Sequence, residues 1–343
     1  MNPSERTTLL KRLALDEGFD EVGVAAAAPL GRSAFLQEWL ERGFAGSMDY
    51  LHRNAETRSN PTAMLAGARS IIVVALQYAQ PSPPGPEDSR PRGRIARYAW
   101  GQDYHDVLRD KLRQLVARLR EALPEAFDSR ICVDTAPILE RELATAAGIG
   151  WIGKNTLVLN AKRGSYFFLG ELITTLEFTP DAPANDHCGS CTRCLDACPT
   201  QAFVEPHVMD ARRCIAYLTI ERRDDIPAEF HAAMGNWIYG CDICQEVCPF
   251  NRKVPDTREP AFAVRPPAPS VPLDEVLGWT HETYNHILGK SAMQRASLAM
   301  FQRNARIAMT NAQGEEPGTE GAQNRAPASD NHHGDPMADT PAP

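Results

Sequence analysis

Apolar positions in the first 180 residues follow two periodicities. A spacing of three to four residues predicts helices, at 5–19, 32–42 and 103–123. Short apolar runs predict strands, at 21–25, 70–76, 130–134 and 165–178. Pro137 predicts the first turn of a further helix that reaches about Ala147. Because strands alternate with helices, we expect an α/β domain over 1–180.

Beyond residue 180 the pattern changes. Cysteines crowd the segment 181–255, which we interpret as a second domain. The proline-rich stretch Pro255–Pro272 and a helical pattern near Gln294–Ala312 predict a linker and a short helical segment over 256–312. The segment 313–343 is rich in Gly, Pro, Asn and acids and poor in apolar residues, so we expect a disordered acidic tail.

Composition and charge narrow the class of protein. Apolar residues make up 43% of the chain and charged residues 23%, as in folded globular proteins. The longest apolar run, Ile71–Leu76, is far shorter than the roughly 20 residues that cross a bilayer, so we expect no membrane partner. The net charge of -8 argues mildly against a nucleic-acid partner, because such proteins usually carry a basic patch. However, the segment 311–343 contributes six acids against one arginine, so the rest is only slightly acidic.

The start of the chain bears on its compartment. Residues 1–6 lead directly into a helical pattern, with no secretory layout and no twin arginine. We therefore expect a cytoplasmic protein, in which thiols stay reduced and clustered cysteines bind metal.

Seven of the nine cysteines fall into two runs with iron–sulfur spacing. The run from Cys188, CxxCxxCxxxCP, has the spacing of bacterial ferredoxins, in which three thiolates hold one cubane and the fourth reaches a second. The run from Cys241, CxxCxxxCP, lacks a leading cysteine, which Cys214 can supply. Pseudo-twofold pairing then gives two sets, Cys188, Cys191, Cys194 and Cys248 for one 4Fe-4S cluster and Cys198, Cys214, Cys241 and Cys244 for the other.

Two other interpretations of these cysteines stay open. Zinc sites also use CxxC pairs, although zinc does not require the CxxCxxCxxxCP run. Clusters could also act only as structural staples, but two clusters in series are typical of an electron path. We therefore expect two 4Fe-4S clusters that carry electrons.

Five motifs spread over residues 1–310 resemble those of the epoxyqueuosine reductase family. They are RYAWGQDYH (97–105), VDTAPILER (133–141), GIGWIGKN (148–155), CGSC (188–191) and YGCDICQ (239–245). The resemblance implies a nitroreductase-related, cobalamin-binding α/β domain, capped by a ferredoxin-like module with two 4Fe-4S clusters and followed by a short C-terminal helical segment.

The resemblance also implies an activity. Such an enzyme reduces epoxyqueuosine at the wobble position of tRNA to queuosine, which takes two electrons and two protons. Electrons would come from flavodoxin or ferredoxin and pass through the clusters to cobalamin, in a protein that we expect to be a monomer. Asp103-Tyr104-His105 only approaches the cobalamin motif DxHxxG, so we expect no histidine as lower cobalt ligand.

Asp134 is the candidate catalytic acid. It ends a predicted strand just before a helix, where α/β proteins often place functional groups. We expect burial to raise its pKa so that it can protonate the epoxide oxygen. The alternative is an aspartate that only caps the helix. Cys132, two residues earlier, shares its strand face and is expected to be a small buried residue.

Contacts with cobalamin follow from the resemblance and from a glycine-rich loop at 148–153. A loop without side chains would let the backbone approach a large flat ligand, although an ordinary turn is the alternative. Likewise, Arg58 could pair with a corrin amide or phosphate or be an exposed loop charge. The family usually has serine where this chain has Ala216, so any hydrogen bond from that side chain is lost. The expected contact residues are Arg58, Asp134, Lys154, Asn155, Thr156, Ala216, Gly240, Cys241 and Asp242.

Two basic pairs flank the cysteine module and could meet tRNA phosphates, or be solvated surface: Arg222 and Arg223, and Arg252 and Lys253. Two enzyme or carrier classes compete with the reductase. A reductive-dehalogenase-like corrinoid reductase resembles the module order but normally carries a twin-arginine signal. An iron–sulfur electron-transfer protein would bind no corrin and would not need Asp134.

Overall fold

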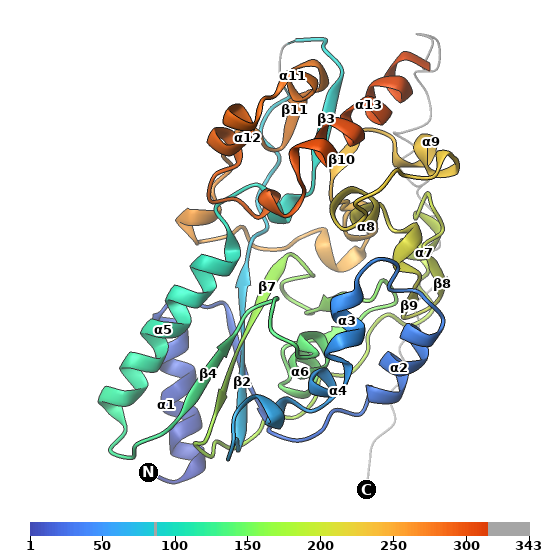
Figure 1. The fold of residues 1–343 in the computed structure, drawn as a ribbon. Coiled ribbons are helices and arrows are strands. Elements are labelled where there is room, and N and C mark those ends of the chain that lie inside the picture. The colour runs from blue at the N-terminus through green and yellow to red at the C-terminus, as the bar shows by residue number, and fades with distance from the viewer. Residues whose placement is uncertain (86–87, 315–343) are drawn as a thin grey trace, which may run out of the picture.

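A four-stranded sheet lies at the centre of the N-terminal half of the computed structural model, which describes residues 1–85 and 88–314 (Figure 1). Each neighbouring pair of strands is antiparallel. The central strand β2 is buried at every position, because its apolar run packs on both faces. The order is β1 (Glu21–Ala26), β2 (Ser70–Gln77), β7 (Phe167–Thr174) and β4 (Ser129–Cys132). The predicted mixture of strands and helices is confirmed.

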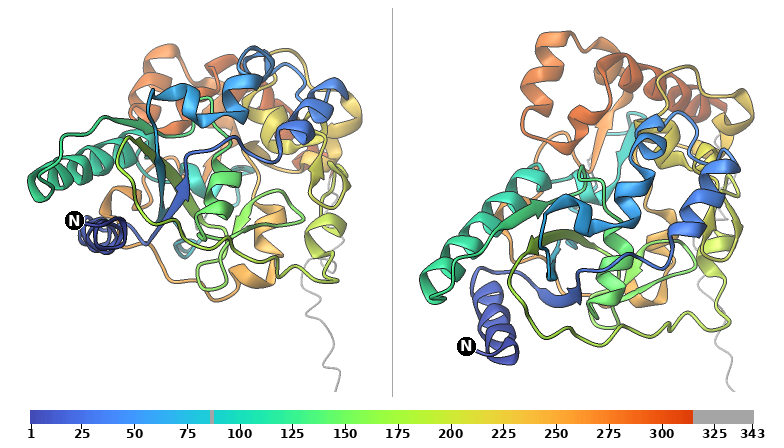
Figure 2. Two further views of the ribbon diagram at one scale, coloured as in Figure 1. Left: turned by 90° about the horizontal axis from the view of Figure 1, so that it is seen from below. Right: turned by 60° about the horizontal axis from the view of Figure 1, so that its bottom comes forward.

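Two long helices cover one face of this sheet. α1 (Pro3–Asp16) begins with a capping box between Asn2 and Glu5, and Asp103 caps α5 (Tyr104–Ala122). The apolar faces of both helices share one core with β2 and β7. Figure 2 shows the two helices on the same side of the sheet. The helical periodicity therefore identified both the elements and the faces that they bury.

A short helix covers the opposite face. α6 (Glu140–Ala146) packs on β2 and β7 through Leu143 and Ala144. The helix predicted from Pro137 thus begins three residues late, because the chain first makes a loop in which Asp134 has a left-handed φ of 52°. This loop places Glu140 at the start of the helix, next to Asp134.

Segments from all three expected domains build a second sheet. β3 (Arg92–Ile95) pairs in parallel with β10 (Trp237–Tyr239) and antiparallel with β11 (Ser270–Pro272). Three helices close over these strands, α11 (Leu273–Gly278), α12 (His281–Leu288) and α13 (Leu298–Gly314). The helical segment expected near Gln294–Ala312 corresponds to α13, and the apolar residues of this part of the chain share a core with Ile95, Ile238 and Tyr239.

The remaining elements are short. The cysteine-rich segment contains α7 (Arg193–Asp196), β8 (Phe203–Glu205), β9 (Val208–Met209), α8 (Ile215–Ile220), α9 (His231–Met234) and α10 (Ile243–Glu246). Elsewhere lie α2 (Ser33–Glu41), α3 (Asp49–Arg53), α4 (Ala55–Ser59) and the hairpin of β5 (Trp151–Ile152) and β6 (Val158–Leu159).

A buried polar network joins the first sheet to the cysteine-rich segment. The side chain of Gln245, in α10, donates to the Ser165 hydroxyl at 3.0 Å. Asn251 donates to the same hydroxyl at 3.0 Å and to the Gln245 carbonyl at 2.8 Å, and accepts from the Ser165 amide at 2.7 Å. Because buried amides are costly when unpaired, this network fixes the two halves against each other.

The expected acidic tail, 313–343, lies outside the described residues from 315 onward, and α13 continues past Ala312 to Gly314. Among the helices of the described ranges, none has the length and apolarity needed to cross a membrane.

We expect Phe301→Ala to lower the free energy of unfolding by about 3–5 kcal/mol, because it removes a large buried side chain. Phe301 is fully buried, and its ring stacks on Tyr239 with centroids 5.6 Å apart. Urea denaturation would measure the loss. As a control on the same helix, the exposed Arg306→Ala should change stability by less than about 0.5 kcal/mol. Equal stability of the two variants would contradict the C-terminal core.

Candidate functional site

Three cysteines gather around Cys194, in α7. Burial raises the pKa of its thiol to about 11, and the nearby Cys248, Cys188 and Cys191 add to that effect. These four residues are the first expected ligand set. The fold brings Cys248 to the loop of the other three from more than fifty residues away.

The second set gathers around Cys241 and Cys244. Burial raises the pKa of the Cys241 thiol, and Cys214 and Cys198 raise it further. Burial likewise raises the pKa of Cys244, to which Cys214, Cys241 and Cys194 contribute. Because Cys194 belongs to the first set, the two sets are neighbours.

Hydrogen-bond donors point at the sulfurs of both sets. The indole nitrogen of Trp151 donates to the Cys188 sulfur at 3.5 Å, and the Ala202 amide donates to the Cys198 sulfur at 3.3 Å. Hydrogen bonds to the sulfurs tune the reduction potential of iron–sulfur clusters, and each 4Fe-4S cluster is held by four thiolates. The donor set therefore fits two 4Fe-4S clusters.

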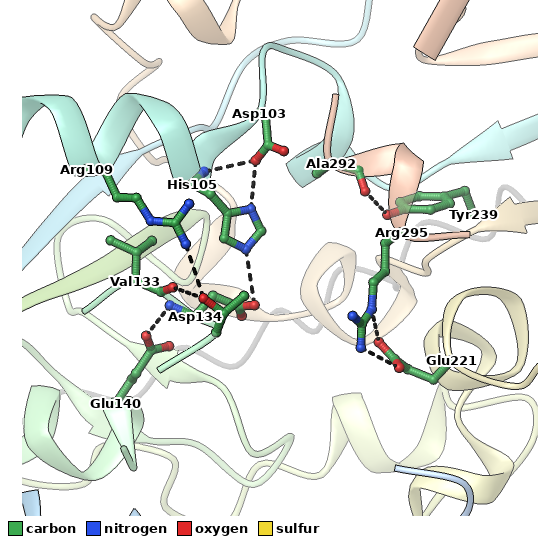
Figure 3. A network of polar contacts seen from close by, with 11 residues as sticks. Asp103, His105, Arg109, Val133, Asp134, Glu140, Glu221, Tyr239, Ala292 and Arg295 are labelled. Carbon is green, nitrogen blue, oxygen red and sulfur yellow. Dashed lines mark hydrogen bonds and ion pairs between the residues drawn. The ribbon is translucent and has the colours of Figure 1, made fainter. Parts of the chain in front are cut away.

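Asp134 forms a polar relay with two residues from the start of α5 (Figure 3). Nε2 of His105 lies 3.2 Å from Oδ2 of Asp134, and Nδ1 of His105 lies 2.7 Å from Oδ1 of Asp103. Asp103 also accepts from the His105 amide as the cap of α5. The imidazole is therefore held between two carboxylates.

The charges of this relay differ from the expectation for Asp134. Partial loss of hydration pushes the pKa of Asp134 upward, but the hydrogen bond and charge of His105 outweigh this effect and hold the pKa below its usual range. Burial opposes the charged form of His105, yet Asp103 and Asp134 raise its pKa to about 9. The expected raised pKa of Asp134 is wrong here, because its partner is a cation. At neutral pH the proton sits on His105.

Arg141 connects this relay with the second cysteine set. Its side chain is exposed, and its charge interacts with Glu140 and Asp134 on one side and with Cys214 and Cys244 on the other. The guanidinium donates to a backbone carbonyl at 2.9 Å. The candidate acid and the second cysteine set therefore both lie close to one cation.

Arg58 belongs to the same region. It is buried in α4, with only 8% of its surface exposed, and its guanidinium lies over the ring of Tyr50 at 5.9 Å. Arg295 also lies over this ring and pairs with both carboxylate oxygens of Glu221 at 2.9 Å (Figure 3). The alternative of an exposed loop charge at Arg58 is therefore wrong. Nε of Arg58 has no hydrogen-bond acceptor within the described residues.

The glycine-rich loop folds as the β5–β6 hairpin. A side chain at Gly150 would meet the Leu159 carbonyl at 2.2 Å, so close packing requires the glycine. Lys154 points at the first cysteine loop, where its ammonium donates to the carbonyls of Gly189 at 2.6 Å and Cys191 at 3.0 Å. The glycine-rich loop thus forms a hairpin turn, and Lys154 supports the first cysteine loop.

Two neighbours of Lys154 behave differently. Asn155 is buried, and its amide nitrogen has no partner among the residues that the structure describes. Thr156 has a left-handed φ of 66°, and its carbonyl accepts from Arg141. Both residues thus remain candidates for contact with a ligand near Arg141.

The other expected contact residues lie around the second cysteine set. Ala216 is half-buried in α8, and Gly240 has a positive φ of 67° and donates its amide to Thr219 at 3.0 Å. Asp242 is buried and accepts from the Arg97 amide at 2.7 Å, and burial raises its pKa to about 6. The carboxylate thus anchors the chain next to Cys241.

The two basic pairs differ in their surroundings. Arg222 is tied to its own loop, with contacts to the Asp225 carbonyl at 2.6 Å and Asp224 at 3.2 Å. Its partner Arg223 is exposed and reaches the sulfur of Met300 at 3.6 Å. In the other pair, Arg252 and Lys253 are exposed and form no ion pair with a described residue.

Sequence reasoning missed several residues of this region. His105 was considered only as a possible cobalt ligand, and Glu140, Glu171 and Arg295 were not considered. Glu171 did carry a signal, because it is the only charge in the apolar run FFLGELIT of β7. Cys132 is 1% exposed and burial raises its pKa to about 12, in agreement with a small buried residue.

Two family models match the chain. Residues 58–135 match "Epoxyqueuosine reductase QueG, DUF1730", and residues 187–251 match a "4Fe-4S double cluster binding domain". Among solved structures, a crystal structure of epoxyqueuosine reductase with an epoxyqueuosine-modified tRNA-Tyr stem loop has a TM-score of 0.85 at 34% identity, covering 90% of this chain and 82% of that one. The Streptococcus thermophilus enzyme has a TM-score of 0.82 at 35% identity, covering 89% and 81%.

Curated relatives agree over most of the chain. The epoxyqueuosine reductase of Cyclobacterium marinum is 40% identical over 302 residues, which are 88% of this chain and 96% of the relative. That of Pseudomonas aeruginosa is 40% identical over 320 residues, which are 91% and 87%. Together with the family models, these similarities place the chain in the epoxyqueuosine reductase family.

Proposed function

We propose that the protein reduces epoxyqueuosine at the wobble position of tRNA to queuosine. The observation that carries this proposal is that the charge of Arg141 acts both on Asp134, which is hydrogen-bonded to His105 in the relay, and on Cys214 and Cys244 of the second cysteine set. A proton source and a cluster site thus share one location. The relative solved with an epoxyqueuosine-modified stem loop supports this substrate.

Electrons would reach this location through the cluster module. The family model over residues 187–251 describes two 4Fe-4S clusters, and the two cysteine sets are neighbours through Cys194 and Cys244. We infer that flavodoxin or ferredoxin supplies the electrons and that the protein acts as a cytoplasmic monomer. The boundaries at 180, 255 and 312, like the nitroreductase-related origin of the α/β half, belong to this proposal.

The residues near Arg141 fit a cofactor rich in amide and phosphate acceptors, as cobalamin is. Arg58 Nε and Asn155 Nδ2 are donors without a hydrogen-bond partner in the described part of the chain. Together with Lys154, Thr156, Ala216, Gly240, Cys241 and Asp242, they would hold it. When bound, cobalamin supplies the reducing centre for the epoxide carbon.

The chain itself supplies protons. Conversion of the epoxide to an alkene releases its oxygen as water, which takes up two protons. His105 holds a proton at neutral pH, and its Nε2 lies within transfer distance of Asp134 Oδ2 at 3.2 Å. Asp134, 54% exposed, would deliver this proton to the epoxide oxygen, and His105 would reload it.

Contacts with tRNA are inferred for two basic pairs. Arg252 and Lys253 are exposed and free to meet phosphates, whereas Arg222 is tied to its loop and Arg223 lies next to it. The exposed pair should therefore contribute more to binding.

The activity can be tested with anaerobically purified protein, chemical reductant and tRNA that carries epoxyqueuosine. We expect queuosine, detected by mass spectrometry of nucleosides, only when cobalamin is added. Two intact clusters without corrin binding or product would instead favour an iron–sulfur electron carrier.

Asp134→Asn should bind both clusters and cobalamin yet lose at least about a hundredfold in kcat, because general acid catalysis typically contributes about 10²–10⁴. Asp128→Asn is a matched control, since Asp128 is exposed before the other end of β4. Iron content, corrin absorbance and turnover would be measured for both. Normal turnover of Asp134→Asn would remove this residue from the mechanism.

Asp103→Asn should lower the pKa of His105 from about 9 toward its ordinary value, because the substitution removes one of its two carboxylates. Asparagine still caps α5. Since the raised pKa stabilises the fold fully below about pH 6.5 and less as pH rises through about 9, the variant should lose more stability at low pH than at high pH. NMR titration of the imidazole would measure its pKa, and unfolding below about pH 6.5 and above about pH 9 would measure the loss of stability in each range. An unchanged pKa would contradict the relay.

A further inference from the structure

A carboxyl group lies in the middle of the apolar sheet. Glu171, on β7, pairs with Val73 of β2 and Cys132 of β4, and none of its surface is exposed. Neither of its carboxyl oxygens meets an N–H or hydroxyl donor within the described residues. Burial, with Glu140 as the next cause, raises the pKa of Glu171 well above its usual range. A group in this setting is neutral, because an isolated buried carboxylate would be far too costly.

Glu140 lies between this buried acid and the catalytic loop. The carboxyl groups of Glu140 and Glu171 lie near enough for Glu140 to raise the pKa of Glu171, and a hydrogen bond between them would require a proton on one of the two. On its other side, Oε1 of Glu140 accepts from the Asp134 amide at 2.5 Å (Figure 3). Glu140 thus lies between the Asp134 amide, from which it accepts, and the buried Glu171.

The loop needs such a contact. Asp134 has a left-handed φ of 52°, which costs energy for a residue with a side chain and persists only where the surroundings impose it. The same residue must present its carboxylate to Nε2 of His105. A fixed acceptor for the Asp134 amide supports both the left-handed backbone conformation and the position of the carboxylate.

We propose that Glu171 and Glu140 form a buried latch that positions Asp134: protonated Glu171 donates to Glu140, and Glu140 accepts the Asp134 amide. Both are positioning residues, since neither needs to touch substrate or cofactor. This inference rests on the proposed function only in the catalytic part assigned to Asp134.

Other charges near the latch act on it. Burial and then Asp134 raise the pKa of Glu140 to about 7, while Arg141 lowers it. The titratable and charged groups that face the pair are Asp134 and Arg141 on its own segment, Arg58 on α4, Tyr104 on α5 and Cys132 on β4.

Two substitutions of Glu171 separate the latch from simple packing. Glu171→Gln keeps a neutral donor of the same shape for Glu140, whereas Glu171→Met keeps the length and removes the donor. We expect Glu171→Gln to keep kcat within about twofold, and Glu171→Met to lose about tenfold in kcat with KM for tRNA unchanged. Removing a buried acid should leave thermal stability equal or higher, so a loss of kcat would not reflect unfolding.

A second readout does not depend on turnover. Hydrogen exchange of a peptide spanning residues 131–138 includes the Asp134 amide in its uptake. Uptake of deuterium should be about tenfold faster in Glu171→Met and unchanged in Glu171→Gln. Glu142→Gln is the matched control on α6, because Glu142 accepts from the Arg32 amide at 2.9 Å, away from the relay.

The outcomes are distinct. Normal kcat and exchange in Glu171→Met would overturn the latch, and so would equal impairment of the Gln and Met variants. If the wild-type protein converts no epoxyqueuosine, the proposed function fails, but the exchange comparison still decides whether the latch exists.

Discussion

The hydrogen bonds among Ser165, Gln245 and Asn251 are the constraint on which the site depends. Gln245 follows Cys244 directly, and Asn251 comes three residues after Cys248, so both amides belong to the cysteine runs. Their common partner, Ser165, precedes β7 of the first sheet. Because amides sealed from water must find partners, the cysteine-rich segment has one position against the sheet. That position brings Cys214 and Cys244 to Arg141, and with them to Asp134.

The proton chemistry grows from the same sheet. β4 has only four residues, so the chain leaves the sheet at Cys132 and forms the Asp134 loop beside β7. Asp103 caps α5 and thereby fixes His105 in the first turn of the helix, facing this loop. On the far side, Glu140 and the buried Glu171 tie the loop to the sheet. Each carboxyl group has a different partner, and these partners give the groups different charges at one pH.

Local pattern predicted much of this structure. The apolar run at 70–76 predicts a central strand, and the leucine face at 103–123 predicts a packing helix. The structure contains both elements. Cysteine spacing likewise predicts two ligand sets, and the fold brings the members of each set near one another.

Properties set by distant residues could not be predicted in the same way. The pKa of Asp134 depends on His105, twenty-nine residues away, and Arg58 is buried against Tyr50 by tertiary packing. Prolines near 270 suggested a linker, yet Pro272 ends an edge strand, where no amide donor is needed.

The central claim is that each cysteine set holds its own 4Fe-4S cluster. Iron analysis and EPR of Cys214→Ala test it most directly. The account predicts that iron falls from about eight to about four atoms per chain with one cubane signal kept, whereas eight retained irons would contradict it.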